Sequence, residues 1–254
     1  MAPLSQEQID QYLQEGYTVL ENALDEQAVQ TLRTRVEGIA AGELPFPDAC
    51  IEFDPGAPRK RHIDNLRKIN SPAAHDAFFM IHAAQKNLLD AATALLGPDI
   101  KFFADQLFIK GPGGMEKTCH QDSAYFHIEP MAILTAWVAL DDVTIENGCL
   151  WVVPGSHREG LKDHSEAWMV GNRQDQKIPD AQIDRDREKP ILLKAGDCSF
   201  HHSLLLHRSG PNQTDTRRRG LATHYMSARS RWTGAPEDQP DYPLLKGRAY
   251  PDCV

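Results

Sequence analysis

His120 and Asp122 are separated by one residue in Thr118-Cys119-His120-Gln121-Asp122-Ser123-Ala124-Tyr125. On an extended strand, side chains two residues apart point to the same face, so this imidazole and this carboxylate can meet one cation. A second imidazole, His207, follows a β-rich stretch and can complete the set. Two histidines and one carboxylate leave three positions open on an octahedral ion, as in non-haem Fe(II) oxygenases. We therefore predict a catalytic metal centre formed by His120, Asp122 and His207.

A lone His-x-Asp is weak evidence, because such tripeptides are common on solvated strand edges. The segments around the pair are more specific. An apolar run at 132–140 precedes Asp141-Asp142, and then come Glu146-Asn147-Gly148-Cys149-Leu150-Trp151-Val152-Val153-Pro154-Gly155-Ser156-His157 and the His207 segment. This ordered set resembles the phytanoyl-CoA dioxygenase-like (PhyH) family of Fe(II)/2-oxoglutarate-dependent oxygenases. The resemblance covers most of the chain, including residues 4–20, 111–114 and 196–197.

The resemblance implies an enzyme whose cofactors are Fe(II), 2-oxoglutarate as cosubstrate and O2. Such an enzyme hydroxylates, or otherwise oxidises, an unactivated C–H bond of a small-molecule substrate and releases succinate and CO2. In halogenating relatives a small residue replaces the carboxylate, so Asp122 favours hydroxylation. Two alternatives are a zinc-type metallohydrolase and a non-catalytic jelly-roll binding protein. The arginine at position 218 argues against the first, and the intact ligand set argues against the second.

Arg218 is the predicted anchor for the distal carboxylate of 2-oxoglutarate. A guanidinium can bind a carboxylate bidentately, and a strand returning after the turn at Gly210-Pro211-Asn212 would pass the metal site. Arg217 and Arg219 flank it, and alternation along a strand places the Arg218 side chain on the face opposite to theirs. The family resemblance also aligns the anchoring arginine with Arg218. The alternative is that all three arginines form a solvated basic edge.

Further positions match family residues that border the cosubstrate. Gln106 shares a face with Phe108 on the strand before His120, and Trp137 matches another family position. Tyr125 and Ser209 can donate hydrogen bonds to the oxoacid, and Lys68 lies near a family lysine. Core packing is the alternative for Trp137. Alternation along 199–207 places His201 on the face of His207, so it can line the cavity, whereas six other histidines are expected to be surface or satisfied core groups: His62, His75, His82, His127, His164 and His224.

Composition excludes some classes of partner. The chain has 254 residues, 41% of them hydrophobic, and a net charge of −9, so nucleic acids and anionic membranes are poor partners. No apolar run is long enough to span a bilayer, and the N-terminus lacks the features of a signal peptide, so we expect a cytoplasmic protein. The five cysteines have no Cys-x-x-Cys spacing and are interpreted as reduced thiols. Cys119 is expected to face away from the metal.

The pattern of the chain indicates helices followed by strands. Ser5 caps a first helix that ends at Gly16, and helices are predicted over 25–41 and 72–96, with a loop over 42–65. Strands are predicted at 17–20, 100–109, 132–140, 149–153, 191–193, 199–206 and 220–228.

This order predicts an α+β protein. The family resemblance makes its core a double-stranded β-helix of jelly-roll, cupin-like type with N-terminal and flanking helices. We predict a single domain over 1–254, with mainly helical support over 1–97, the β-helix core over 98–228 and a tail over 229–254.

The polar segment 156–190 interrupts the β half and is either a surface excursion or a substrate lid closed by Trp168. The loops 42–65 and 156–190 and the tail are expected to line the substrate pocket. They contain Arg59-Lys60-Arg61-His62, Arg229 and Arg231, so we expect a polar or anionic small-molecule substrate, unless these charges are solvated. An acyl-CoA stays open by family analogy, and the sequence leaves the oligomeric state open.

Overall fold

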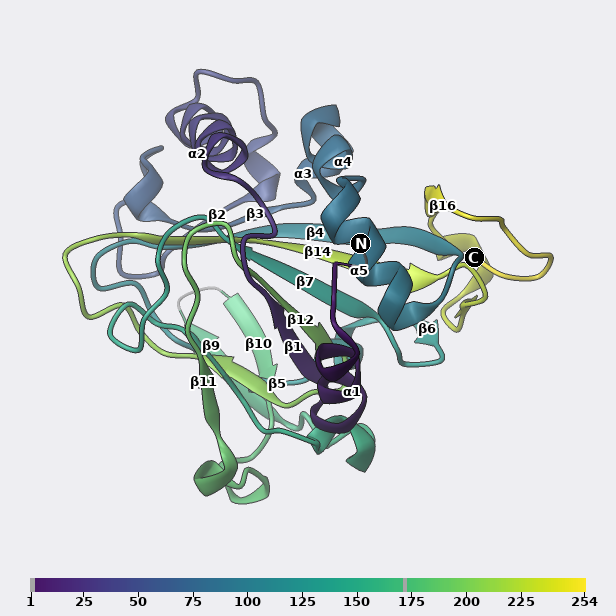
Figure 1. Cartoon of the computed structure of the whole chain (residues 1–254). Helices are drawn as coiled ribbons and strands as arrows, with labels where there is room; N and C mark the ends of the chain where they lie inside the picture. Colours follow the sequence, from purple (N-terminus) through teal and green to yellow (C-terminus); the bar gives the residue numbers. More distant parts are fainter. Residues whose placement is uncertain (1–2, 171–172) are drawn as a thin grey trace.

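The computed structural model describes residues 3–170 and 173–254, and two antiparallel sheets form its centre (Figure 1). Among the described residues, the larger sheet has eight strands in the order β1-β12-β7-β14-β4-β3-β2 with β16 beside β4, and the smaller has four in the order β11-β8-β13-β5. The strands of the larger sheet are β1 (Tyr17–Leu20), β2 (Ile51–Phe53), β3 (Leu66–Asn70), β4 (Ile100–Lys110), β7 (Leu134–Ala139), β12 (Cys198–His202), β14 (Arg218–Ser227) and β16 (Leu244–Lys246). Those of the smaller are β5 (Lys117–His120), β8 (Leu150–Val152), β11 (Lys189–Ile191) and β13 (His207–Ser209).

Helices cover the outer face of the larger sheet (Figure 1). Ser5 and Gln8 form a capping box at the start of the first helix, and Gly16 ends it in the left-handed conformation with φ 83°. The predicted helix over 25–41 is also confirmed, with Asp25 as its N-cap and Gly42 as its C-cap. The helices are α1 (Gln6–Glu15), α2 (Glu26–Ala41), α3 (Pro72–His75), α4 (Ala77–Ala83) and α5 (Lys86–Leu96).

The single helix predicted over 72–96 is wrong, because the chain forms three helices there. Asp76 is extended, with φ −146° and ψ 110°, and its carboxylate accepts the amide of Phe78 at the start of α4. Gln85 also leaves the helical conformation before α5, with φ −59° and ψ 139°, but its side chain makes no cap hydrogen bond. A side chain that caps a new helix competes with continuation of the old one, and the apolar periodicity does not register this.

The loop predicted over 42–65 is partly wrong. It contains β2, which pairs with β3, and β3 in turn pairs with β4. β3 has the sequence Leu66-Arg67-Lys68-Ile69-Asn70, which is too polar and too short to predict a strand. The sheet is therefore wider than the predicted core over 98–228, because β1, β2 and β3 precede that range and β16 follows it.

The strand predicted over 199–206 ends early, and His207 begins a new strand in the other sheet. β12 stops at His202 and pairs with β7 in the larger sheet, whereas β13 pairs with β5 and β8 in the smaller one. Residues 203–206 carry the chain across the gap between the sheets. His201 and His207 therefore face each other from opposite sheets, and the expected common face of one strand is wrong.

Alternation divides the larger sheet into an outer and an inner face. In β7 all six residues are buried. Leu134, Ala136 and Val138 belong to the main core beneath the helices, whereas Thr135 and Trp137 face the space between the sheets. Burial on both faces is what a sheet between a helical layer and a second sheet requires. The predicted α+β jelly-roll architecture is confirmed.

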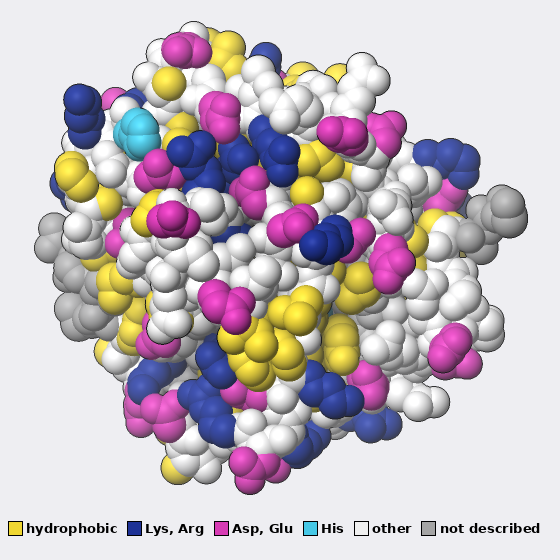
Figure 2. All heavy atoms as spheres, turned by 60° about the vertical axis from the view of Figure 1, so that its left-hand side comes forward, with side chains coloured by type: hydrophobic (Ala, Val, Ile, Leu, Met, Phe, Trp, Pro, Cys, Tyr) yellow, Lys and Arg dark blue, Asp and Glu magenta, His cyan; other side chains and the backbone are white. Residues whose placement is uncertain are grey.

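Smaller elements complete the chain. β6 (Ile128–Glu129) pairs with β15 (Arg231–Trp232), and β9 (Glu166–Val170) pairs with β10 (Arg173–Lys177). Short 3-10 turns lie at Asp48–Cys50, Ile63–Asn65, Asp122–Tyr125, Ser156–Glu159, Asp180–Gln182, Arg185–Arg187 and Pro236–Asp238. Figure 2 shows Lys and Arg side chains interspersed with Asp and Glu on the face it presents. No helix in the described part of the chain is long and apolar enough to cross a membrane.

Candidate metal centre

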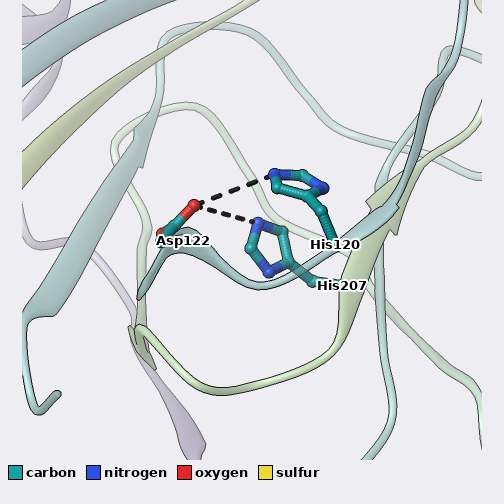
Figure 3. Close-up of side chains that lie close together, drawn as sticks. All are labelled: His120, Asp122 and His207. Carbon is teal, nitrogen blue, oxygen red and sulfur yellow. Dashed lines mark ion pairs between the residues drawn. The ribbon is translucent and has the colours of Figure 1, made fainter. Parts of the chain in front are cut away.

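Strand pairing brings His120 and His207 together. β5 and β13 run antiparallel, and His207 lies opposite His120 in their register. The two imidazole rings are therefore neighbours, with centroids 4.3 Å apart (Figure 3).

Asp122 reaches the same point from just beyond the end of β5. Gln121 is extended, with φ −120° and ψ 135°, so His120 and Asp122 project to the same side. The Gln121 side chain is fully buried and donates to the carbonyls of Gly160 and Leu204. The expected alternation therefore holds across these three residues, although β5 ends at His120 and Asp122 already begins a 3-10 turn.

The potential ligand atoms converge on one small volume (Figure 3). Asp122 Oδ1 lies 3.8 Å from His120 Nε2 and 3.6 Å from His207 Nε2. One such atom from each of the three residues lies within 4.8 Å of the other two. Two imidazoles and one carboxylate at this spacing can hold one divalent ion and leave its other positions open.

Both histidines present an unprotonated nitrogen to the centre. His120 Nδ1 lies 2.8 Å from the carbonyl of Thr118, and His207 Nδ1 lies 3.0 Å from that of Leu205. A carbonyl only accepts, so each Nδ1 carries the proton and each Nε2 keeps its lone pair. Burial lowers the pKa of both imidazoles, and His207 lowers that of His120 further. The residues therefore fit a metal ion, because a neutral imidazole is the form that binds one.

Asp122 is ionised despite its burial. Burial alone would raise its pKa, but the neighbouring imidazoles of His207, His201 and His224 outweigh that effect and hold the pKa well below its usual range. The centre therefore combines two neutral donors with one negative charge.

A row of polar side chains holds the second oxygen of Asp122. Thr135 Oγ1 lies 2.9 Å from Asp122 Oδ2 and 2.9 Å from His224 Nδ1, and His201 Nε2 lies 3.6 Å from the same Oδ2. The hydroxyl has one proton and the carboxylate only accepts, so Thr135 donates to Asp122 and accepts from His224. His224 had been expected to be a surface or satisfied core group. It instead lines the central cavity, and its Nε2 has no partner among the described residues.

A cavity of about 240 Å³ adjoins the three converging side chains. His201 lines it, as expected, from the sheet opposite His207. All six side chains predicted to border the cosubstrate also line it, namely Lys68, Gln106, Tyr125, Trp137, Ser209 and Arg218.

Arg218 alone of the three consecutive arginines lines this cavity. Its Nη2 donates to the carbonyl of Gly148 at 2.7 Å, and its Nε has no hydrogen-bond partner among the described residues. Burial lowers its pKa to about 10, so it is charged at neutral pH. Arg217 instead pairs with Asp64, and Arg219 pairs with Asp141. The buried donor atom without a partner fits an anionic ligand such as the cosubstrate's carboxylate.

The Trp137 ring packs against the guanidinium of Arg218. The guanidinium carbon lies 5.3 Å from the centre of the Trp137 ring, which is a cation–π contact. The other predicted side chains have their own contacts. Ser209 Oγ accepts from Lys110, Lys68 pairs with Glu52 at 3.3 Å, and the Tyr125 hydroxyl donates to the carbonyl of Gln176.

Several cavity residues were missed by the sequence analysis, although alternation supplies a signal for most of them. His224 has the same parity as Arg218 on β14, Thr135 has that of Trp137 on β7, and Lys110 has that of Gln106 on β4. Arg67, Lys117 and Arg208 also line the cavity. They lie on strands too short and polar to be recognised.

The basic clusters predicted to line the pocket do not do so. Within the described residues, no side chain of 42–65, 156–190 or the tail after 228 lines the cavity. Arg61 pairs with Asp48 and donates to backbone carbonyls. Arg229 lies over the Tyr250 ring, and Arg231 lies in β15. Arg61 and Arg229 thus have partners outside the cavity, which is the commoner fate of a basic run.

Part of the segment 156–190 nevertheless lies near the cavity. β9 carries Trp168, whose ring lies 5.1 Å from the Arg67 guanidinium carbon and 5.7 Å from Lys117 Nζ. Both basic residues line the cavity. The paired strands β9 and β10 of this segment thus contact the cavity wall through Trp168, and closure over a substrate stays a prediction.

Comparisons with known proteins agree with this geometry. The family model of phytanoyl-CoA dioxygenase (PhyH) matches residues 12–220. The peroxisomal phytanoyl-CoA dioxygenase of Rattus norvegicus is 30% identical over 89% of this chain and 69% of its own length. Methylphosphonate hydroxylase of Gimesia maris is 31% identical over 87% of this chain and 80% of its own. The crystal structure of EctD from S. alaskensis with 2-oxoglutarate and 5-hydroxyectoine is 24% identical, with a TM-score of 0.76 over 99% of this chain and 86% of that one.

A jelly roll that joins two histidines and a carboxylate beside a cavity between its sheets defines the class of Fe(II)- and 2-oxoglutarate-dependent oxygenases. Its cofactors are Fe(II), 2-oxoglutarate and O2. Within that class, the chain belongs to the phytanoyl-CoA dioxygenase family. The zinc hydrolase and the non-catalytic binding protein considered as alternatives are therefore set aside.

Proposed function

We propose that His120, Asp122 and His207 hold the Fe(II) and that the enzyme hydroxylates a C–H bond of a compact anionic substrate. The observation that carries this proposal is the convergence of two neutral imidazoles and one carboxylate beside a small cavity with cationic walls. When bound, Fe(II), 2-oxoglutarate and O2 supply the oxidising chemistry, in which 2-oxoglutarate becomes succinate and CO2 while one oxygen atom enters the substrate. A carboxylate at position 122 supports hydroxylation over halogenation.

The protein's part at the metal is to hold the ligands in one protonation state. Carbonyl acceptors fix the tautomers of His120 and His207. Thr135 occupies Asp122 Oδ2, so Oδ1 is left to face the imidazoles. Fixed partners of this kind orient metal ligands and raise the affinity of the site.

Arg218 is the proposed partner of the distal carboxylate of 2-oxoglutarate. Its position is set by the Trp137 ring and the Gly148 carbonyl. Ser209 offers a hydroxyl nearby, and Gln106, Tyr125 and Lys68 are proposed to border the cosubstrate. A charge-assisted contact in such a buried place contributes more than it would in water.

The charges of the cavity support an anionic substrate. Basic side chains outnumber acidic ones in its lining, where Arg67, Lys68, Lys110, Lys117, Arg208 and Arg218 face Glu116 and Asp122. Bound Fe(II) would add two positive charges and 2-oxoglutarate two negative ones, so together they leave this excess unchanged. Pairing of Lys68 with Glu52 and of Arg208 with Glu188 reduces the excess without removing it. The name of the Gimesia maris relative also specifies a small anion, methylphosphonate.

The size of the cavity supports a compact substrate. At about 240 Å³ it is smaller than the roughly 300–1,000 Å³ of common ligand sites, and it has to hold 2-oxoglutarate as well. An acyl-CoA would leave most of its length outside. We therefore favour a small phosphonate or carboxylate over the thioester that the rat relative's name specifies.

The test is a substrate panel with the Fe(II)-loaded protein, scored by succinate formation and by mass spectrometry of the product. Methylphosphonate and other small phosphonates and carboxylates are compared with neutral analogues of equal size and with acyl-CoA thioesters. We expect coupled turnover with a small anion and none with its neutral analogue. Acyl-CoA turnover at an equal rate would contradict the proposed substrate class.

The metal assignment is tested in the same assay. His207→Ala and Asp122→Asn should each lose Fe(II) binding and turnover, whereas His62→Ala, at an exposed histidine beside Asp64, should keep both. Full Fe(II) binding by either of the first two variants would show that the iron is held elsewhere.

A further inference from the structure

One buried nitrogen of His224, Nε2, has no hydrogen-bond partner among the described residues. The His224 side chain on β14 is 4% exposed and lines the cavity that Thr135 and Asp122 also line. Its other nitrogen, Nδ1, lies 2.9 Å from Thr135 Oγ1. A buried polar atom without a partner is unfavourable, so a ligand that supplies the missing partner would be preferred there.

The hydrogen bonds that begin at Asp122 fix which nitrogen of His224 carries the proton. The Asp122 carboxylate only accepts, so Thr135 gives its single proton to Asp122 and its oxygen accepts from His224 Nδ1. Burial also lowers the pKa of His224 to about 4, so the ring is neutral near pH 7. A neutral imidazole with its proton on Nδ1 has a lone pair on Nε2. His224 Nε2 is therefore an acceptor, and only a donor can satisfy it.

Aromatic side chains surround the His224 ring. The ring centroids of Phe126 and Phe103 lie 5.5 and 6.5 Å from that of His224, and both contacts are edge-to-face. Phe126 also lines the cavity. Phenyl rings hold the imidazole in place without offering Nε2 a conventional hydrogen bond. The donor therefore has to come from a molecule bound in the cavity.

We propose that His224 Nε2 accepts an acidic O–H of the substrate, and that the substrate is bound as a hydrogen phosphonate monoanion. An alkylphosphonate keeps one O–H on phosphorus after its first ionisation, whereas an ionised sulfonate or carboxylate keeps none. A lone pair of either of these anions would face the lone pair of Nε2, which is repulsive. The site therefore selects a small phosphonate over a sulfonate or carboxylate. This inference rests on the proposed function, in which the substrate is a compact anion.

The position of His224 also suits oxidation at the carbon next to phosphorus. Thr135 contacts both His224 and Asp122, which is one of the three converging side chains of the metal centre. In methylphosphonate a single phosphorus atom joins the acid oxygens to the methyl carbon. An O–H bound at His224 Nε2 therefore keeps the methyl C–H close to the metal centre.

The experiment compares two acids of the same tetrahedral shape, methylphosphonate and methanesulfonate. Alkylphosphonates release their second proton less readily than phosphate monoesters, for which the second pKa is about 6. At about pH 6 both acids are therefore mainly monoanions, and only the phosphonate carries an O–H. Calorimetric titration of the protein loaded with Mn(II) and 2-oxoglutarate measures binding without turnover. We expect the natural protein to bind methylphosphonate about tenfold or more tightly than methanesulfonate.

Variants separate the acceptor role of His224 from a structural one. His224→Asn places an amide where Nδ1 lies, so it can still donate to Thr135, but it has no group at the position of Nε2. It should bring the two affinities to within about twofold of each other. Thr135→Val removes the acceptor that holds the proton on Nδ1, so the preference should fall there too, whereas Thr135→Ser should keep it. His127→Asn, at an exposed histidine that packs against the Trp232 ring, is the matched control.

The outcomes distinguish this inference from the proposed function. Equal affinities of the natural protein for the two acids would overturn the inference. A preference that survives in His224→Asn, or an equal loss of affinity for both acids in that variant, would overturn it too. If His224→Asn does not fold, the natural protein and the pair Thr135→Val and Thr135→Ser still decide. If the natural protein binds neither acid more tightly than neutral dimethyl sulfone, which has a similar shape, the proposed anionic substrate class is wrong as well.

Discussion

Gly220 lies against the Trp137 ring, which occupies the space that a side chain at position 220 would need. A Cβ atom on Gly220 would lie 1.8 Å from Trp137 Cζ2, which no adjustment of a flexible chain end can relieve. Trp137 in turn supports the guanidinium of Arg218. The position of the Arg218 guanidinium therefore depends on a residue that does not itself line the cavity.

Gly220→Ala is expected to displace the Trp137 ring and, with it, the Arg218 guanidinium. We expect a loss of about 1–3 kcal/mol in the free energy of unfolding, which is typical of overpacking, together with a raised 2-oxoglutarate requirement. Denaturant unfolding and the KM for 2-oxoglutarate measure the two effects. Gly56→Ala is the control, because the nearest atom to its Cβ is an Asp54 oxygen at an ordinary 3.6 Å. A variant with natural stability and KM would refute this dependence.

At the scale of elements, three neighbouring strands build the support for Asp122. The register of β12, β7 and β14 places His201, Thr135 and His224 in one row. Each strand contributes one side chain, so the row exists only when the three strands are aligned. Asp122 comes from the opposite sheet and receives the Thr135 hydroxyl across the gap.

Thr135→Val removes that hydroxyl at nearly constant shape. His224 Nδ1 would then lose its partner and Asp122 Oδ2 would keep only His201, so we expect a loss of about 1–3 kcal/mol in stability and weaker Fe(II) binding. Thr135→Ser keeps the hydroxyl and should retain Fe(II) affinity. Thermal unfolding of the metal-free protein and Fe(II) titration separate the two effects. Equal Fe(II) affinity in Val and Ser variants would mean that Thr135 does not orient the carboxylate.

At the scale of the whole molecule, one buried carboxylate links stability to pH. Asp105 on β4 accepts the amide of Ala73 at the start of α3, and it is 2% exposed. Burial raises its pKa to about 7 from an ordinary value of 3.8, although the Ala73 amide opposes the shift. Between these two values the folded state keeps a proton that the unfolded state has released. The contribution of the Asp105 carboxyl to stability therefore falls as pH rises between these two pKa values, and it stays low at higher pH.

Asp105→Asn keeps an acceptor for Ala73 and removes the charge. We expect the variant to be more stable than the natural protein at about pH 8 and similar to it near pH 4, where the natural carboxyl is protonated. Melting temperatures of the two metal-free proteins over this range test the expectation. A constant difference across the range would rule out ionisation of Asp105 as its cause.

Local patterns in the sequence predict much of the site. The spacing of His120 and Asp122 predicts two side chains on the same side of the chain, because alternation depends only on local backbone geometry. The same alternation separates Arg218 from Arg217 and Arg219. Capping residues predict the ends of the first two helices for the same reason, since Ser5 and Asp25 act within one turn. The resemblance of ordered motifs indicated the jelly-roll core.

Contacts between residues far apart in the chain depend instead on how the strands pair. His207 joins the centre because β13 pairs with β5 in the second sheet, and the sequence had suggested continuation of β12. Lys110, Thr135 and His224 enter the cavity through the registers of β4, β7 and β14. Arg61 and Arg229 of the basic runs, in contrast, contact partners outside the cavity. Strand register and the assignment of a strand to one sheet or the other depend on contacts between distant segments, so no local pattern specifies them.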